Sequence, residues 1–535
     1  MATGDADGKG QMTSEQLVVI YERLMQKDFY YLDVDKEIEA VGRLIDVSCD
    51  LSMKEGLDRA IGELELLLTR DVTASQRSVA HYFVGNAWSH LRVLKHADPQ
   101  TIWEWEQVEI EKEILNFRCF NNFFRQSDRN RGRFCQANTN MANTLNHIGR
   151  FVEAIESWDR ALRAYSSFGM ALANKGLGLI SYMQSLYDDG HAKIFLRFAY
   201  ELLRRGLKDK AIHEATRRGF EQTFKQIESW GSKEFFEGKL ELDDYELGDH
   251  ESERLYRKWC LEHRLFLNPL NDLGAYNIAA RDILTCPSLY VPVEESSGVP
   301  PSYFSFYNQI KQEYVAARYI FYESLQADGA HFSDKGVLLY NTLEYPCYGL
   351  NTEKAKVGFR VAYSLFDKIA YFLNEYLKLD VKDRRISFRT LWYKDQKKSK
   401  GLHERFAKLQ NWPMRGLFWL AKDFSERRSE FSDAMEPEAN DIAAIRNSLE
   451  HKYLTITEYD MSDVEGMGDG LERGITRISR DDFIQKTFKL FHLGRAALIY
   501  LSLATHAEER KKRKVIEGKI VPPMFLDTWD DEWKT

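Results

Sequence analysis

The sequence predicts an almost wholly helical protein, with a solenoid of helix pairs followed by a compact helical bundle. Proline is scarce, with 11 in 535 residues, which suits helices better than many short strands with proline-rich turns. Apolar residues recur at spacings of three and four in both halves of the chain, as on one face of a helix. Because one hydrophobic core rarely serves 535 residues, two to four domains are expected.

The composition is that of a globular protein, with 44% hydrophobic and 29% charged residues. The net charge of −8 gives no general attraction to nucleic acid, so any such binding needs a local basic patch. Six scattered cysteines form no C-x-x-C pair and indicate reduced thiols, and the polar start "MATGDADGKGQ" lacks the features of a secretory signal. We therefore expect a cytoplasmic protein without a membrane span, in which the apolar stretch 488–507 forms a buried helix.

The first half of the chain contains a repeat, clearest in "GRFVEAIESWDRALRAYSSFGMALANKG" at 149–176. Small residues at 149, 154 and 161 alternate with large apolar residues at 151, 155, 158 and 162, as two closely packed helices require. The segment resembles a tetratricopeptide repeat (TPR), and weaker copies precede it at 55–68 and 80–91. We expect a polar segment and a leading helix over 1–34 and a TPR-like α-solenoid over 35–230.

A connector is expected over 231–300, acidic at 232–253 and irregular through the proline-containing stretch 286–306. A helical domain is expected over 301–513, with helices at "QEYVAARYIFYESL", at "EKAKVGFRVAYSLFDKIAYFLNEYL" and over 481–513. Residues 514–535 would form a C-terminal tail.

The stretch "AAIRNSLEHKYL" at 443–454 carries polar residues that a core helix would not need. An arginine and a histidine five or six residues apart are expected by chance in a chain of this composition. Arg257 and His263 are such a pair, and we interpret them as ordinary polar residues of a helix. Asn447 directly after Arg446 makes the second pair, Arg446 and His451, less accidental.

An apolar stripe of Ile442, Ile445, Leu449 and Tyr453 is expected on the helix that carries this motif, with Pro437 in its first turn. Asn447 and His451 are four residues apart and share a face. Five residues of ideal helix place Arg446 about 140° around the axis from His451. Either the long arginine side chain covers part of that angle, or a second copy of the protein completes the site.

The "RNSLEH" motif resembles the R-x(4–6)-H motif of the HEPN superfamily (higher eukaryotes and prokaryotes nucleotide-binding domain), and "LFDKIAYFLNEYL" at 365–377 resembles the long first helix of such domains. The resemblance implies a C-terminal HEPN helical bundle coupled to TPR-like repeats. It also implies a homodimer whose facing motifs cut RNA without a metal or another cofactor. Arg446, Asn447 and His451 would be catalytic, with Asp367 as a supporting polar residue, and the insertion over 380–435 is longer than the family pattern.

A basic stretch at 381–430 contains fourteen lysines and arginines against six acidic residues, interleaved with aromatic residues. Such a segment either binds RNA, through phosphate contacts and base stacking, or forms a solvated surface around a small aromatic core. The candidate RNA-binding residues are Arg384, Arg385, Arg389, Lys397, Lys398 and Trp392.

Two functions remain open at this point. One is a metal-independent HEPN endoribonuclease, producing 2′,3′-cyclic phosphate and 5′-hydroxyl ends and regulated by a protein or peptide partner on the TPR array. The resemblance implies for such an enzyme a role as a toxin or in anti-phage defence, with tRNA or another structured RNA as its substrate. The alternative is a non-catalytic TPR/HEPN adaptor or nucleotide-binding interaction module.

Overall fold

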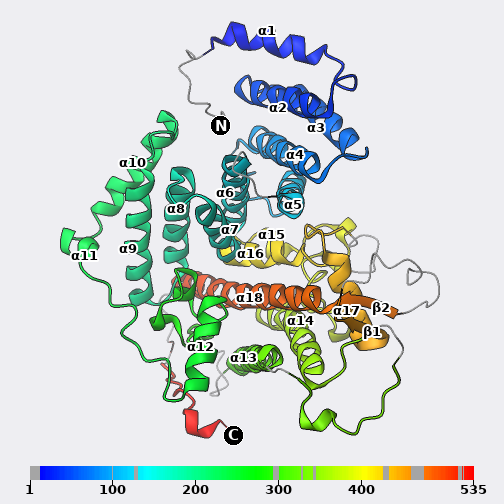
Figure 1. Ribbon diagram of the computed structural model, residues 1–535. Coiled ribbons are helices and arrows are strands. Elements are labelled where there is room, and N and C mark those ends of the chain that lie inside the picture. The colour runs from blue at the N-terminus through cyan, green and yellow to red at the C-terminus, as the bar shows by residue number, and fades with distance from the viewer. Residues whose placement is uncertain are drawn as a thin grey trace. The chain divides into compact units, whose positions relative to one another are not determined.

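The computed structural model describes residues 12–98, 101–125, 130–292, 301–326, 329–341, 345–425, 433–459, 475–515, 521 and 523–534. Over these residues the protein has eighteen α-helices and a single two-stranded sheet (Figure 1), so the predicted all-α class is confirmed. The chain folds into two compact units. The first comprises residues 1–184, 188–244 and 392–452, and the second comprises 185–187, 245–391 and 453–535.

The first unit begins with eleven consecutive helices, of which neighbours from α1 to α7 pack against one another. Their bounds are α1 Ser14–Met25, α2 Val34–Asp50, α3 Lys54–Leu68, α4 Ala74–Lys95, α5 Val108–Phe123, α6 Arg131–His147, α7 Phe151–Ala164, α8 Gly169–Ser185, α9 Asp189–Gly206, α10 Glu214–Glu228 and α11 Lys233–Glu237.

Small residues lie where these helices approach closely, as the repeat pattern predicted. A Cβ on Gly85 of α4 would come within 3.0 Å of the Phe117 ring on α5, and one on Gly178 of α8 within 2.4 Å of Trp158 on α7. A large side chain on one helix thus fills the space that a glycine leaves on the next. The pairing fits helix-pair repeats, and the TPR assignment itself remains a prediction.

Three later helices also belong to the first unit: α15 Glu404–Ala407, α16 Trp412–Ala421 and α17 Ala439–His451. Gly149 has a φ of +87° and ends α6, and its backbone approaches α16 so closely that a Cβ there would meet the Trp412 carbonyl. The Trp412 ring stacks on Phe151 at 4.6 Å between centroids. The described residues between 392 and 452, which were expected within the helical domain over 301–513, thus belong to the first unit.

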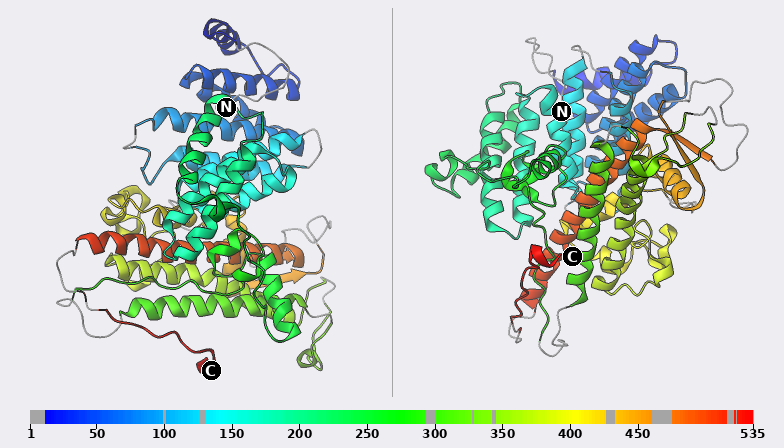
Figure 2. Two further views of the ribbon diagram at one scale, coloured as in Figure 1. Left: turned by 90° about the vertical axis from the view of Figure 1, so that its left-hand side faces the viewer. Right: turned by 60° about the horizontal axis from the view of Figure 1, so that its bottom comes forward.

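The second unit contains α12 Glu251–Glu262, α13 Ser302–Gln326, α14 Leu350–Leu377 and α18 Arg480–Val515, as well as strands β1 Tyr453–Thr457 and β2 Ile475–Ser479. The strands are parallel. Helices α13, α14 and α18 lie side by side (Figure 2). Stacked rings join them: Phe321 of α13 with Phe491 of α18, and Phe359 of α14 with Phe483 of α18.

The long C-terminal helix was predicted correctly, since α18 spans Arg480–Val515. Arg495 is 1% exposed and pairs with Asp272 at 2.6 Å. A buried guanidinium with such a partner is tolerated inside a protein. Among the described residues, no helix is long and apolar enough to cross a membrane.

The described part of the expected connector, residues 231–292, contains both exposed and buried segments. Residues 232–253 are mostly exposed, as expected, but Cys260, Leu261 and Leu267 are buried, because α12 and the turns after it pack in the second unit. Irregular structure was predicted as far as 306, whereas α13 already begins at Ser302, directly after Pro301. Parts of several predicted segments (1–11, 293–300, 426–432, 460–474, 516–520, 522 and 535) lie outside the described residues.

Candidate active site

The "RNSLEH" motif occupies the last turn and a half of helix α17. Ile442, Ile445 and Leu449 are all buried and form the predicted stripe. Tyr453 was expected to extend the stripe but is 75% exposed, because the helix ends at His451 and Tyr453 begins strand β1. Pro437 precedes the helix rather than lying in its first turn.

The three motif side chains lie off the buried stripe. Arg446 and Asn447 are half-buried, and His451 is exposed. The Arg446 guanidinium donates a hydrogen bond from Nη1 to the Asn447 amide oxygen at 3.3 Å. Asn447 therefore helps to orient the arginine, which is a role that the sequence pattern did not indicate.

His451 is the last residue of α17. The next residue, Lys452, has φ −142° and ψ −152°, so the chain becomes extended immediately after the histidine. The sequence from 453 to 457, YLTIT, is rich in aromatic and β-branched residues, which favours the strand that follows. The local sequence thus ends the helix at the histidine and leaves its imidazole open to solvent.

Asp367 lies on α14 in the second unit. Its carboxylate accepts a hydrogen bond from the backbone N–H of Phe388 at 3.3 Å, which ties the segment after α14 back to that helix. This is a structural contact of the second unit. A supporting role for Asp367 in catalysis remains a proposal.

The basic residues predicted to bind RNA differ in exposure. Arg384 and Arg385 are exposed on a short 3₁₀-helix, Asp383–Arg385, while Lys397 is exposed and Lys398 is half-buried. The interpretation of Trp392 needs correction, because it is fully buried, with its ring 4.7 Å from Phe406 and 6.4 Å from Trp105. It has no face open to a base.

Arg389 is also only 4% exposed, so its guanidinium is not presented at the surface for a phosphate. The alternative reading of the stretch, an aromatic core with a charged surface, describes residues 392–424 better. Tyr393, Phe418 and Trp419 are fully buried as well.

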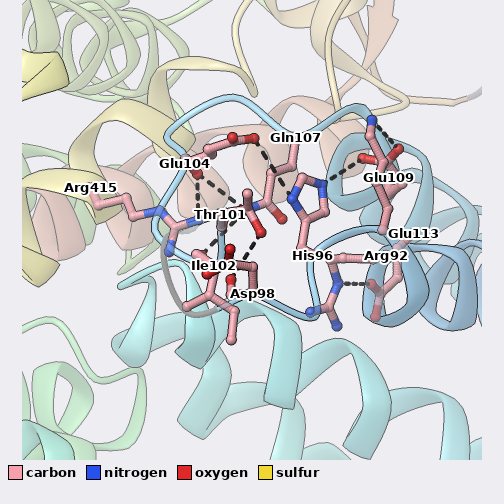
Figure 3. Close-up of polar contacts among 11 residues, drawn as sticks. Arg92, His96, Asp98, Thr101, Ile102, Glu104, Gln107, Glu109, Glu113 and Arg415 are labelled. Carbon is pink, nitrogen blue, oxygen red and sulfur yellow. Dashed lines mark hydrogen bonds and ion pairs between the residues drawn. The ribbon is translucent and has the colours of Figure 1, made fainter.

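A second polar cluster in the first unit was not anticipated from the sequence (Figure 3). The His96 ring lies between Glu104, at 3.7 Å from Nδ1, and Glu109, at 3.5 Å from Nε2. Beside it, Arg92 donates to the Glu113 carboxylate at 3.1 Å, and burial raises the pKa of Glu113. A histidine between carboxylates can act as an acid or base, but His96 is only 6% exposed.

The cluster attaches residues 101–107 to α16. Arg415 of α16 donates from Nη2 to the Glu104 carbonyl at 2.8 Å (Figure 3), and burial with Arg92 nearby lowers the pKa of Arg415 to about 10. Burial, with Arg415 and Arg92 close by, also lowers the pKa of His147 to about 3. We assign these groups to packing of the first unit. Among the residues described, no group of His, Cys, Asp or Glu side chains is arranged to hold a metal ion.

Comparison with known protein families gives one match. Residues 294–508 match the family described as LA2681-like HEPN. The chain contains a HEPN domain over these residues. The matched range includes α13, α14, the motif helix α17 and most of α18, so the motif lies inside the HEPN domain. No curated protein and no solved structure matches the chain.

Proposed function

We propose that the HEPN domain is a metal-independent endoribonuclease whose catalytic groups are Arg446, Asn447 and His451. The observation that carries the proposal is the end of α17, where an arginine held by a neighbouring amide and a solvent-exposed histidine occur together within the matched domain. The HEPN match supports a ribonuclease or nucleotide-related function in general.

The proposed reaction is an intramolecular displacement in RNA. One histidine takes the proton of the 2′-hydroxyl, the 2′-oxygen attacks phosphorus, and the bond from phosphorus to the 5′-oxygen breaks. A second acid returns a proton to the leaving 5′-oxygen, which gives a 2′,3′-cyclic phosphate and a 5′-hydroxyl. Arg446, permanently charged and fork-shaped, stabilises the charge that develops on the phosphoryl oxygens.

A homodimer accounts for the angle between Arg446 and His451 on one helix, because the arginine of one copy and the histidine of the other can then face one substrate. It also brings a second histidine close to the substrate, and either this histidine or a water molecule can return the proton to the leaving oxygen. The N-terminal helices would bind a protein or peptide partner and thereby regulate this composite site. The proposed biological role of the enzyme is that of a toxin or an anti-phage defence effector. The proposed enzyme acts in the cytoplasm.

Incubation of the purified chain with total RNA and EDTA tests the proposal. We expect cleavage that survives the chelator and leaves cyclic phosphate ends. Intact RNA at enzyme concentrations in the micromolar range would instead favour the non-catalytic adaptor.

Mixing two inactive variants tests whether the site is shared. A heterodimer of His451→Ala with Arg446→Ala retains one Arg446 and one His451 on opposite chains. Activity that returns after verified subunit exchange supports a shared site. No recovery would show that both groups act within one chain or that two histidines are required.

A further inference from the structure

One arginine of the N-terminal helices contacts both ends of the connection that leads into the motif helix. Arg118 of α5 forms a bidentate ion pair with Asp423, in which Nη1 donates to Oδ1 at 2.7 Å and Nη2 donates to Oδ2 at 3.0 Å. The same Nη1 lies 3.6 Å from Oε2 of Glu436. Asp423 follows the end of α16 by two residues, and Glu436 precedes α17 by three.

Backbone hydrogen bonds fix the same junction. The Met435 N–H donates to the Lys422 carbonyl at 2.9 Å, which closes the connection between α16 and α17 at its base. The Ala439 N–H, the first of α17, donates to the Glu436 carbonyl at 3.0 Å, and the Glu438 N–H donates to the Glu436 carboxylate at 3.3 Å. Glu436 therefore belongs to the turn that starts the motif helix, and Arg118 holds that turn.

Buried charges make this attachment costly to break. Arg150, the residue directly before α7, pairs with Asp423 at 2.6 Å, and both side chains are at most 1% exposed. Lys422, equally buried, pairs with Glu111 of α5 and lies 3.5 Å from Glu106. A buried charge deprived of its partner is strongly unfavourable, so α5 and α7 lock the end of α16 in place. The pair between Arg118 and Glu436 is longer and more exposed than the pair between Arg150 and Asp423, and it is the contact that reaches the motif helix.

We propose that Arg118 is a positioning residue for the α17 motif, and that its ion pairs with Asp423 and Glu436 transmit the arrangement of α5 and α7 to Arg446, Asn447 and His451. The inference rests on the proposed ribonuclease function and concerns the regulation of that same site. A partner that displaces α5 would separate Arg118 from Glu436, release the first turn of α17 and reduce cleavage.

The test uses the full-length chain and two readouts, of which only the second needs catalysis. Glu436→Gln removes the charge that faces Arg118 and leaves the pairs of Asp423 intact. Without RNA, amide hydrogen exchange in peptides from 436–451 should become about tenfold faster, because a charge-assisted contact is lost. Exchange in α5 to α7 should stay unchanged. RNA cleavage should fall by about the same factor. Glu404→Gln is the matched control, since Glu404 pairs with Lys394 at the surface, and neither readout should change.

Arg118→Met and Arg118→Lys form a second pair of variants. The methionine variant should lose cleavage, and the lysine variant, which keeps a cation near both carboxylates, should restore part of both cleavage and exchange protection. If Arg118→Met fails to fold, the results for Glu436→Gln alone decide whether Arg118 positions the α17 motif.

Unchanged exchange in α17 of folded Glu436→Gln would overturn the inference. So would faster exchange spread equally over α5 to α7, which is a purely structural effect, or faster exchange with wild-type cleavage. If the wild-type chain does not cleave RNA, the proposed function fails, and the exchange readout still decides whether Arg118 positions α17.

Discussion

Replacement of Asp423 by asparagine is the substitution whose effect the structure defines most clearly. The aspartate is 1% exposed and lies between two guanidiniums, those of Arg118 and Arg150. Burial by itself would raise the pKa of Asp423, but the two arginines outweigh it and hold the pKa well below its usual range. Asparagine has nearly the same volume, so Asp423→Asn removes the charge without opening a cavity.

The expected loss is large because two buried cations lose their shared partner. Removing one member of a buried ion pair costs about 3–5 kcal/mol. Asp423→Asn should lower the free energy of unfolding of the first unit by that amount, measured by urea titration at pH 7 and followed by tryptophan fluorescence. Since the folded pKa is depressed, the stabilisation is present above the ordinary value of 3.8 and disappears as the pH falls below it toward the folded pKa. The difference between wild type and variant should therefore shrink below pH 4.

Asp395→Asn is the matched control. Asp395 is 67% exposed in its ion pair with Lys400, and a surface pair of this kind contributes at most about 1 kcal/mol. Asparagine also tolerates the positive φ of 50° at this position. A loss below about 1 kcal/mol for Asp423→Asn, equal to that of the control, would refute the argument that buried charges fasten α16 to α5 and α7.

Three further predictions concern acid sensitivity, the buried tryptophan of the basic stretch and its exposed arginines. The pKa of His147 is lowered to about 3, so below pH 6.5 the unfolded chain binds a proton that the folded chain does not. The free energy of unfolding should therefore fall as the pH drops from 6.5 toward 3. In urea titrations, His147→Gln should make the free energy of unfolding depend less on pH over this range. Trp392→Ala should cost about 3–5 kcal/mol of stability, because the ring is fully buried. The double variant Arg384→Ala and Arg385→Ala should keep its stability and, in titrations with single-stranded RNA, reduce the dependence of log affinity on log salt by about 1.4. Weaker RNA binding by a fully stable Trp392→Ala chain, or an unchanged salt dependence in the arginine variant, would contradict these assignments.

The sequence was sufficient to predict the structure in those segments where the local residue pattern determines it. Helical periodicity predicted α14 and α18 closely and the second half of α13, and the small residues of the repeat, such as Gly85, lie at close helix contacts as expected. The burial of Ile442, Ile445 and Leu449 was likewise predicted, since it follows from helical spacing alone.

The rest depends on contacts between distant parts of the chain. Trp392 looked like a stacking residue because lysines surround it in sequence, but its ring packs on Trp105, 287 residues earlier. In the same way Asp423 meets Arg118 and Arg150 only in the folded chain. No periodicity shows that residues 392–452 pack with the N-terminal helices, because the cause is a tertiary network of buried charges and aromatic rings.

Neither the hydrogen bond between Arg446 and Asn447 nor the end of α17 at His451 was predicted from the sequence. The stripe continues in sequence to Tyr453, and only the strand that begins there ends the helix two residues earlier. The proposed catalytic imidazole therefore lies at the C-terminal end of the helix, where it is exposed.

The rate of RNA cleavage by His451→Ala tests the central claim most directly. The variant should be folded like the wild type, with the same helicity and the same sedimentation, because His451 is exposed and its loss opens no cavity. The proposal predicts that cleavage in the presence of EDTA falls by at least about a hundredfold, as expected when a general acid or base is removed. Cleavage by His451→Ala at the wild-type rate would contradict the assignment of the "RNSLEH" motif as the catalytic site.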